Sequence, residues 1–304
     1  MRNITFSTTF GTNIFFPIFS FLVSIVATQF FAIPFYEQYA LPVLNKNADK
    51  IQLLSNFTND NFYYNPVENH VVNICFLCAS FGYWSMSLLA SFMDLLPLEK
   101  FKTQKSRSYF TITEWFEAVL LSNFNLLVSS WFITLPLMCF WYHLQVYRRE
   151  EMISSYTVKQ FDIYRFPLDI LIHVVTVDVW FYITHRILHY PVLYKLIHKL
   201  HHRFKAPTAV ACMYANPIEF TIGNHLGVAL GPVISNCHPY TAFFWFFLSL
   251  FNTAGCHSGY YLFGAEEHDI HHEKFRFNYG VGGMMDYLCG TRYVESETMK
   301  IKST

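Results

Sequence analysis

Long uncharged apolar runs dominate the hydrophobic pattern of this chain. No Asp, Glu, Lys or Arg occurs from Asn13 to Tyr36 or from Val71 to Met93. Each run exceeds the roughly 20 residues that an α-helix needs to cross about 30 Å of hydrocarbon. The first run is also longer than the core of a signal peptide, which spans about 7–15 residues, so it predicts a retained anchor. The two runs therefore predict two transmembrane helices.

A third and a fourth run are less clear. Ala118 to Tyr142 is long enough to cross, although its two asparagines and one proline could let it bend and re-enter, and both paths remain open. Ile170 to Thr184 is short and carries His173 and Asp178. An acid within a membrane segment is costly and usually faces a protein interior or a water-filled site.

Two Phe-rich stretches follow, Phe220 to Val233 and Tyr240 to Phe263, separated by a short link. They predict a helical hairpin. Together the runs predict an all-α fold, a polytopic membrane helical bundle with about four spans. We interpret residues 1–112 as an N-terminal membrane hairpin with a lumenal loop, and residues 113–304 as the catalytic region.

The composition agrees with a membrane protein. Charged residues make up 14% of the chain and hydrophobic residues 53%, including 33 Phe, whereas ordinary soluble domains are about one quarter charged. The formal net charge is zero and no basic block occurs, so the chain lacks the signature of a polyanion-binding protein. We therefore expect no nucleic acid partner.

Lysines and arginines in short loops predict the orientation, because such loops stay cytoplasmic. The segment after the second run carries Lys100, Lys102, Lys105 and Arg107. Its cytoplasmic position would place the preceding loop, Glu37 to His70, in the lumen, where the sequon Asn56-Phe-Thr58 fits. The tail, Lys300-Ile-Lys302-Ser-Thr304, resembles the retrieval signal of endoplasmic reticulum membrane proteins. We therefore expect a multi-pass protein of that membrane with a cytoplasmic tail.

Eight of the 14 histidines gather in three clusters. The clusters are His185-x-x-x-His189, His198-x-x-His201-His202 and His268-x-x-His271-His272. Positions i, i+3 and i+4 lie on one face of a helix, so each cluster can present its imidazoles in one direction. Imidazole suits iron, zinc, copper or nickel, and a tetrahedral zinc needs only four ligands. Eight histidines therefore predict a site with two metals.

Two further residues lie close to these clusters in the sequence. His257 precedes His268 by eleven residues and follows the last apolar stretch; its position alone leaves open whether it is a ligand. Asp178 lies seven residues before His185, two helical turns earlier on the same face. It could accept a ring N–H and so support a ligand, or it could pair with a neighbouring helix.

With the clusters in place, the region from about Asp178 to Tyr293 resembles the fatty acid hydroxylase superfamily of membrane di-iron enzymes. It most resembles the branch of C-4 methylsterol oxidases and vertebrate fatty acid hydroxylase domain-containing proteins. The matching strings are Asp178-Val-Trp-Phe-Tyr-Ile-Thr-His185-Arg-Ile-Leu-His189, His198-Lys-Leu-His-His202, Lys205-Ala-Pro-Thr208, Tyr214-Ala-Asn-Pro-Ile-Glu219, His257-Ser-Gly-Tyr260, His268-Asp-Ile-His-His272 and Asn278-Tyr-Gly280. The first part of the chain adds only compatible membrane spans.

The resemblance implies an endoplasmic reticulum enzyme whose histidines face the cytoplasm and hold two irons. It also implies O2 as oxidant, electrons from NAD(P)H through cytochrome b5 or a similar carrier, and a ligand role for His257. One position departs from the branch, which usually has His in an Ala-His-Pro string where this chain has Asn216. Asn216 would be a weaker, substituted ligand.

The expected activity is that of an oxygen-dependent di-iron lipid monooxygenase, with sterol C-4 methyl oxidation as the first choice. Fatty acyl or sphingolipid hydroxylation, or desaturation, is an alternative on the same scaffold. A catalytically silent homologue that binds a sterol or serves as a scaffold is a second alternative, and Asn216 is its main support. A metal-ion transporter is disfavoured, because its ligands should be spread across helices at the membrane midplane. The histidines of this chain are instead concentrated at helix ends.

Overall fold

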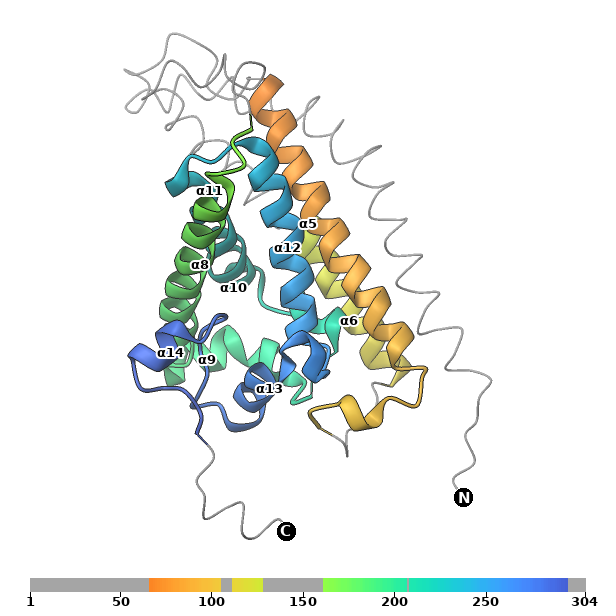
Figure 1. The fold of residues 1–304 in the computed structure, drawn as a ribbon. Helices are drawn as coiled ribbons and strands as arrows, with labels where there is room; N and C mark the ends of the chain where they lie inside the picture. The colour runs from red at the N-terminus through yellow and green to blue at the C-terminus, as the bar shows by residue number, and fades with distance from the viewer. Residues whose placement is uncertain (1–65, 105–110, 128–160, 207, 295–304) are drawn as a thin grey trace, which may run out of the picture.

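The computed structural model describes residues 66–104, 111–127, 161–206 and 208–294 (Figure 1). Within these ranges the secondary structure is helical, and an isolated antiparallel bridge between Lys102 and Tyr260 is the one strand-like feature. The predicted first span, the sequon and the lysine tail lie outside the described residues. The all-α prediction is confirmed for the described part of the chain.

Three long helices give the described bundle its shape. α5 (Pro66–Met93), α8 (Phe166–Leu188) and α12 (Pro239–Cys256) all run from the upper end to the lower end in Figure 1. α11 (Leu226–Ser235) runs the opposite way beside α8. The C-terminal ends of the three long helices therefore lie at the same end of the molecule.

Close backbone contacts join these helices in pairs. α12 packs along α5 at Gly82, where a Cβ atom would lie 2.2 Å from the Phe247 carbonyl oxygen. α11 packs along α8 at Gly231, where a Cβ atom would lie 2.7 Å from the His173 Cα. The hairpin prediction is only partly right, because α11 and α12 are consecutive but each packs mainly against a different long helix.

Shorter elements complete the described fold. They are η4 (Glu99–Phe101), α6 (Ile112–Phe124), α9 (Pro191–Leu196), η7 (His198–Arg203), η8 (Ala209–Met213), α10 (Pro217–Glu219), the π-helix η9 (Phe220–His225), η10 (Tyr261–Phe263), α13 (Ala265–Lys274) and α14 (Met284–Leu288). η8 is buried against α5 and α6. The Asn125 amide donates to the carbonyl oxygens of Met213 and Ala215, at 2.9 and 2.8 Å. This polar residue of the third apolar run thus holds a buried segment in place.

Two described helices are long and apolar enough to cross a membrane, Ile74–Met93 and Phe166–Leu188. They coincide with the second and fourth predicted runs, and α8 extends the fourth run at both ends. Much of α8 is exposed apolar surface, with Leu168, Leu171 and Ile187 exposed by 57%, 58% and 45%. Such a continuous apolar surface fits contact with lipid. The remaining spans stay predictions.

Candidate metal centre

Four elements bring nine histidines together at one end of the bundle. They are the C-terminal ends of α8 and α12, together with η7 and α13. The first pocket consists of His185, His189, His198, His202 and His271, and the second pocket of His201, His257, His268 and His272. Within each pocket the candidate ligand atoms lie within 4.8 Å of one another. Every histidine that the sequence predicted as a ligand lies in one of the two pockets.

Each His-x-x-His-His cluster contributes to both pockets. In η7, His198 and His202 lie in the first pocket and His201 lies in the second. In α13 the assignment is reversed, with His271 in the first pocket and the outer two histidines in the second. Successive residues are about 100° apart around a helix, so adjacent histidines point in different directions. The expectation that a cluster presents all its rings in one direction is therefore wrong for the two His-x-x-His-His clusters, whereas His185 and His189 do face the same pocket.

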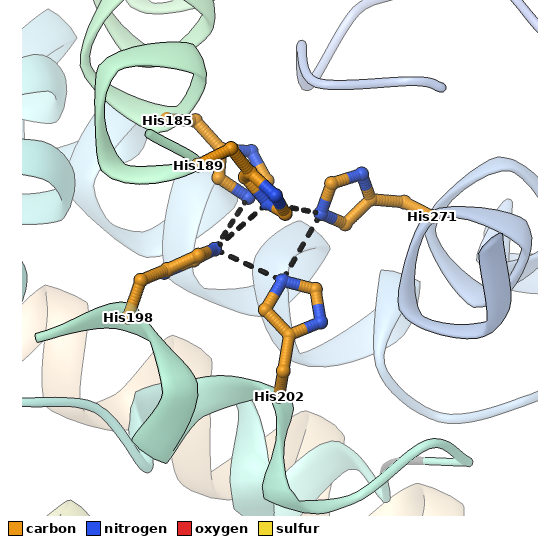
Figure 2. Close-up of side chains that lie close together, drawn as sticks. All are labelled: His185, His189, His198, His202 and His271. Carbon is orange, nitrogen blue, oxygen red and sulfur yellow. Dashed lines mark hydrogen bonds between the residues drawn. The ribbon is translucent and has the colours of Figure 1, made fainter. Parts of the chain in front are cut away.

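In the first pocket the Nε2 atoms converge on one point, as Figure 2 shows. The Nε2 atom of His198 lies 3.0 Å from that of His185, 3.1 Å from that of His189 and 2.9 Å from that of His202. The Nε2 atom of His271 completes the group, 3.1 Å from the Nε2 atom of His189 and 3.2 Å from that of His202. Five ring nitrogens from three separate elements thus face a common centre.

The second pocket is built in the same way from fewer rings. The Nε2 atom of His268 lies 2.8 Å from that of His257 and 3.0 Å from that of His272. The ring of His201 completes the group, with its centroid 4.9 Å from the His272 ring and 5.4 Å from the His257 ring. His257 belongs to this pocket because it caps the C-terminal end of α12.

Oxygen atoms behind the rings fix which ring nitrogen carries the proton. Nδ1 contacts an oxygen in six of the histidines: His185 with Tyr279 O (2.7 Å), His271 with Phe277 O (2.7 Å), His198 with Glu219 Oε1 (2.7 Å), His201 with Tyr214 O (3.3 Å), His257 with Thr253 O (2.8 Å) and His272 with Phe204 O (3.1 Å). Five of these oxygens are main-chain carbonyls, which can only accept, so Nδ1 must donate in those five rings. In a neutral ring the Nε2 lone pair then points into the pocket.

Converging lone pairs are the strongest structural indication of a metal. Acceptor nitrogens about 3 Å apart repel one another, and a cation between them removes the repulsion. The C-terminal ends of α8 and α12 add partial negative charge at this end of the molecule, which also favours a cation. The pockets therefore suit metal ions better than they suit a hydrogen-bonded cluster of histidines.

The ring environments keep these histidines neutral. Burial, together with neighbouring histidines, lowers the pKa of His189 to about 3. Burial lowers the pKa of His201 and of His271 to about 4. The pKa values of His202 and His272 also lie well below the usual range, first because of burial and then because of the adjacent rings. Neutral imidazole is the form that binds metal, so the rings are ready to act as ligands at pH 7.

Asp178 supports the site, but not by the predicted bond to a histidine ring. Its carboxylate accepts hydrogen bonds from the backbone N–H groups of Val281, Gly282 and Met285, at 3.0, 2.7 and 2.9 Å. The ring of His185 instead donates to the Tyr279 carbonyl, in the same C-terminal loop. The acid thus acts on the ligand through that loop, because the loop folds back onto α8 and places main-chain amides nearest the carboxylate.

Asn216 has a local structural role. Its Oδ1 atom accepts from the backbone N–H of Ile218 at 3.0 Å and caps the short helix α10. Asn is among the preferred N-cap residues because its side chain satisfies an otherwise unpaired N–H group. Its oxygen is therefore engaged at the start of a helix, and its role as a substituted ligand stays a prediction.

Sequence reasoning missed the groups that orient the ligands. Glu219 is buried, and its Oε1 atom lies 2.7 Å from Nδ1 of His198. It belongs to a string that carried the family resemblance, so a buried acid next to an apolar stretch was an available signal. The carbonyl oxygens of Tyr279, Phe277 and Tyr214 gave no signal, because every residue has a carbonyl.

Comparisons with known proteins agree with the geometry. The family model described as fatty acid hydroxylase matches residues 170–291. The human fatty acid hydroxylase domain-containing protein 2 is 42% identical over 136 residues, which are 44% of this chain and 41% of that protein. Methylsterol monooxygenase 1 of Rattus norvegicus is 31% identical over 210 residues, 65% of this chain and 68% of that protein.

A fungal relative matches a shorter stretch. Fatty acid hydroxylase ahd1 of Mycosarcoma maydis is 38% identical over 117 residues, 38% of this chain and 30% of that protein. The match to the human protein likewise spans only about two fifths of its length. No solved structure matches the chain.

Proposed function

We propose that this chain, which belongs to the fatty acid hydroxylase family, is a membrane-bound non-haem di-iron monooxygenase that oxidises a lipid with O2. The proposal rests mainly on the two pockets. In each pocket, neutral imidazoles direct their Nε2 lone pairs towards the centre of that pocket. Imidazole donors suit iron, and two adjacent all-nitrogen pockets suit a metal pair. Iron in each pocket would be held by the histidines of that pocket.

An iron pair, when bound, would supply the oxidising power that attack on an unactivated C–H bond requires. The chain's own residues hold the ring nitrogens in place and keep water away. His185, His198 and His271 are each exposed by 2% or less, so bulk water has little access to the first pocket. Oxygen acceptors behind the rings fix the orientation of the rings. Metal affinity depends on this orientation as well as on the ligands themselves.

An apolar substrate fits the open side of the first pocket. His189 is the partly exposed ligand there. Aromatic rings surround it, with centroids 5.6 Å away for Tyr194 and 5.1 Å away for Tyr279. The Phe275 ring lies 4.9 Å from the His202 ring. Aromatic surface contributes apolar contact area to a lipid.

A sterol C-4 methyl group is the substrate we favour. Relatives named methylsterol monooxygenase support this choice. Fatty acyl or sphingolipid hydroxylation is the second candidate, because a fatty acid hydroxylase is also among the relatives. Each hydroxylation would consume one O2 and two electrons, for which we propose NAD(P)H and cytochrome b5 or a similar electron-transfer protein as the source.

The proposed location is the endoplasmic reticulum membrane, with the pockets facing the cytoplasm. The segment with Lys100 and Lys102 lies at the same end as the pockets, in contact with the loop after α12. α5 ends and α8 begins at opposite ends of the bundle (Figure 1). The path of the third apolar run stays a prediction, because much of that run lies outside the described residues.

Complementation of a strain that lacks C-4 methylsterol oxidase tests the function. We expect the chain to restore growth and to remove accumulated 4-methylsterols, with about two irons per purified chain. His268→Ala removes a ligand of the second pocket and should abolish rescue. His238→Asn is the control, because His238 caps α12 outside both pockets and Asn is also a good cap.

Three results would contradict the proposal. Retained rescue by His268→Ala would refute the ligand assignment, and fewer than one iron per chain without any oxygen-dependent product would refute the enzyme. Loss of hydroxylated acyl chains in a knockout, without 4-methylsterol accumulation, would replace the sterol by the acyl substrate. Asn216→His should raise iron retention if Asn216 occupies a ligand position.

A further inference from the structure

We propose that three residues after α5 position the second metal pocket: Asp94, Lys102 and Thr103, here called the α5 clamp. They belong to the part of the chain that the sequence assigned to a membrane hairpin. The structure places them at the histidine end of the bundle, beside the loop that follows α12. None of them is a candidate ligand, so they would act on the metal through the histidines that are candidate ligands.

Thr103 bonds to both elements that carry most of the second pocket. Its backbone N–H donates to the Gly259 carbonyl at 3.0 Å. Its hydroxyl donates to the Asp269 carboxylate and also lies 3.2 Å from the Gly259 carbonyl. Gly259 is two residues after His257, and Asp269 directly follows His268. One threonine thus joins the end of α12 to α13.

An ion pair between a buried lysine and a partly exposed aspartate contacts the same loop. Nζ of Lys102 lies 2.6 Å from Oδ1 of Asp94, and Lys102 is only 5% exposed. The Tyr260 hydroxyl donates to the same carboxylate at 2.8 Å, and the ammonium group lies 5.1 Å from the centre of the Tyr260 ring. Tyr260 is fully buried three residues after His257. Removing one member of such a pair leaves an uncompensated buried charge, so the contact is sensitive to substitution.

This finding corrects the use of Lys102 in the orientation argument. The sequence counted Lys102 as a free loop cation, whereas the structure buries it against Asp94. A buried, paired lysine contributes little to the interaction of a loop with the membrane surface. Its position is better explained by its contact with the loop that carries His257.

The first pocket depends on a different set of supports. Tyr279 and Phe277 in the C-terminal loop orient His185 and His271, and that loop is held by Asp178. The α5 clamp contacts the loop after α12 and Asp269, and it should therefore act mainly on the second pocket. Two metals in one chain would then differ in their response to a single substitution.

Cobalt titration of the full-length, chelator-stripped protein in detergent tests this role. The inference rests on the proposed metal binding, but Co2+ reports ligation without any oxygenase activity. We expect wild-type protein to bind Co2+ in both pockets and Thr103→Val to weaken one of the two sites by about 10–100-fold. Thr103→Ser keeps the hydroxyl group and should restore the Co2+ affinity of that site. Thr111→Val is the matched control, because Thr111 caps α6 by accepting from the Glu114 N–H.

Single-pocket backgrounds assign the weakened site. In a His198→Ala background only the second pocket remains intact, and Thr103→Val should weaken its Co2+ binding. In a His268→Ala background only the first pocket remains intact, and Thr103→Val should have no effect there. Equal weakening in both backgrounds, or wild-type binding by a folded Thr103→Val protein, would overturn the proposal. A wild-type chain that binds no Co2+ would instead refute the metal site itself.

Melting temperatures separate positioning from a general loss of fold. Thr103→Val and Thr111→Val each lose the two hydrogen bonds of one hydroxyl group, so we expect similar shifts in the metal-free proteins. Lys102→Arg keeps the cation next to Asp94 and should retain second-pocket affinity better than Lys102→Met does. If Co2+ affinity follows melting temperature across all four variants, the clamp has only a structural role and the proposal is wrong.

Discussion

At the residue scale, the candidate ligands could be predicted from the sequence, whereas the groups that hold them could not. Eight histidines stood out because they gather in three clusters, and the family resemblance added His257. Their orientation depends on backbone carbonyls and on Glu219, whose positions follow only from the complete fold. Asp178 illustrates the limit: sequence spacing placed it near His185, but the returning C-terminal loop lies between the acid and the ring.

Glu219 should control metal affinity in the first pocket. Glu219→Ala removes the acceptor for Nδ1 of His198, so the ring loses its fixed tautomer and orientation. We expect metal affinity in the first pocket to fall by about 10–100-fold. Glu219→Gln keeps a side-chain oxygen and should lose less. Metal titration measures the affinity of both variants. Glu273→Ala is the control, because Glu273 is an exposed acid on α13.

Unchanged affinity in Glu219→Ala would show that the metal alone orients His198. Equal losses in the Ala and Gln variants would show that a side-chain oxygen at this position is not enough to hold the His198 ring. Both outcomes contradict the expectation that the oxygen acceptor is the main contribution.

At the element scale, apolar runs predicted helices but did not predict their partners. α5 covers an uncharged run and α8 covers an apolar run that carries Asp178, and the hydropathy of both is high enough for a membrane span. An apolar face packs against many others about equally well, so the pairing of α12 with α5 depends on local shape instead. Gly82 supplies that shape, because the Phe247 carbonyl occupies the space that a side chain would need.

Gly82→Ala should therefore separate α5 from α12 and destabilise the protein. The added Cβ would lie 2.2 Å from a backbone oxygen, which cannot move away without shifting a helix. We expect a loss of about 1–3 kcal/mol in the free energy of unfolding, as for other overpacked interiors. Thermal unfolding in detergent measures it. Gly223→Ala is the control, because a Cβ atom there would make only an ordinary contact with Thr184 Oγ1, at 3.8 Å. Equal melting temperatures for the two variants would contradict the packing argument.

At the scale of the whole molecule, the fold joins segments that the sequence presented as separate. Tyr83 of α5 donates to the Val210 carbonyl in η8 at 2.8 Å, across the proposed boundary at residue 112. α5, α8 and α12 also end together, which brings the loop after α5 to the second pocket (Figure 1). Such long-range contacts leave no trace in the hydropathy pattern. The division at residue 112 stays a prediction.

Neutral histidines make the stability of the metal-free protein depend on pH in a defined direction. The unfolded chain takes up protons on histidine near pH 6.5. The folded protein resists protonation of His189 down to about pH 3 and of His201 and His271 down to about pH 4. Between about pH 6.5 and pH 4 the unfolded state therefore binds more protons, so stability falls as the pH is lowered through this window. Above about pH 7 both states are neutral at these rings and the dependence disappears.

Thermal unfolding of the metal-free protein at a series of pH values checks this direction. We expect a nearly constant melting temperature above about pH 7 and a progressive decrease below about pH 6.5. The variant His201→Gln/His271→Gln lacks two of the groups with lowered pKa values and should show a shallower decrease. A melting temperature that rises on acidification would mean that the folded rings bind protons more strongly than the unfolded chain does. Their Nε2 atoms would then carry hydrogens instead of free lone pairs, and the pockets would be unsuited to metal at neutral pH.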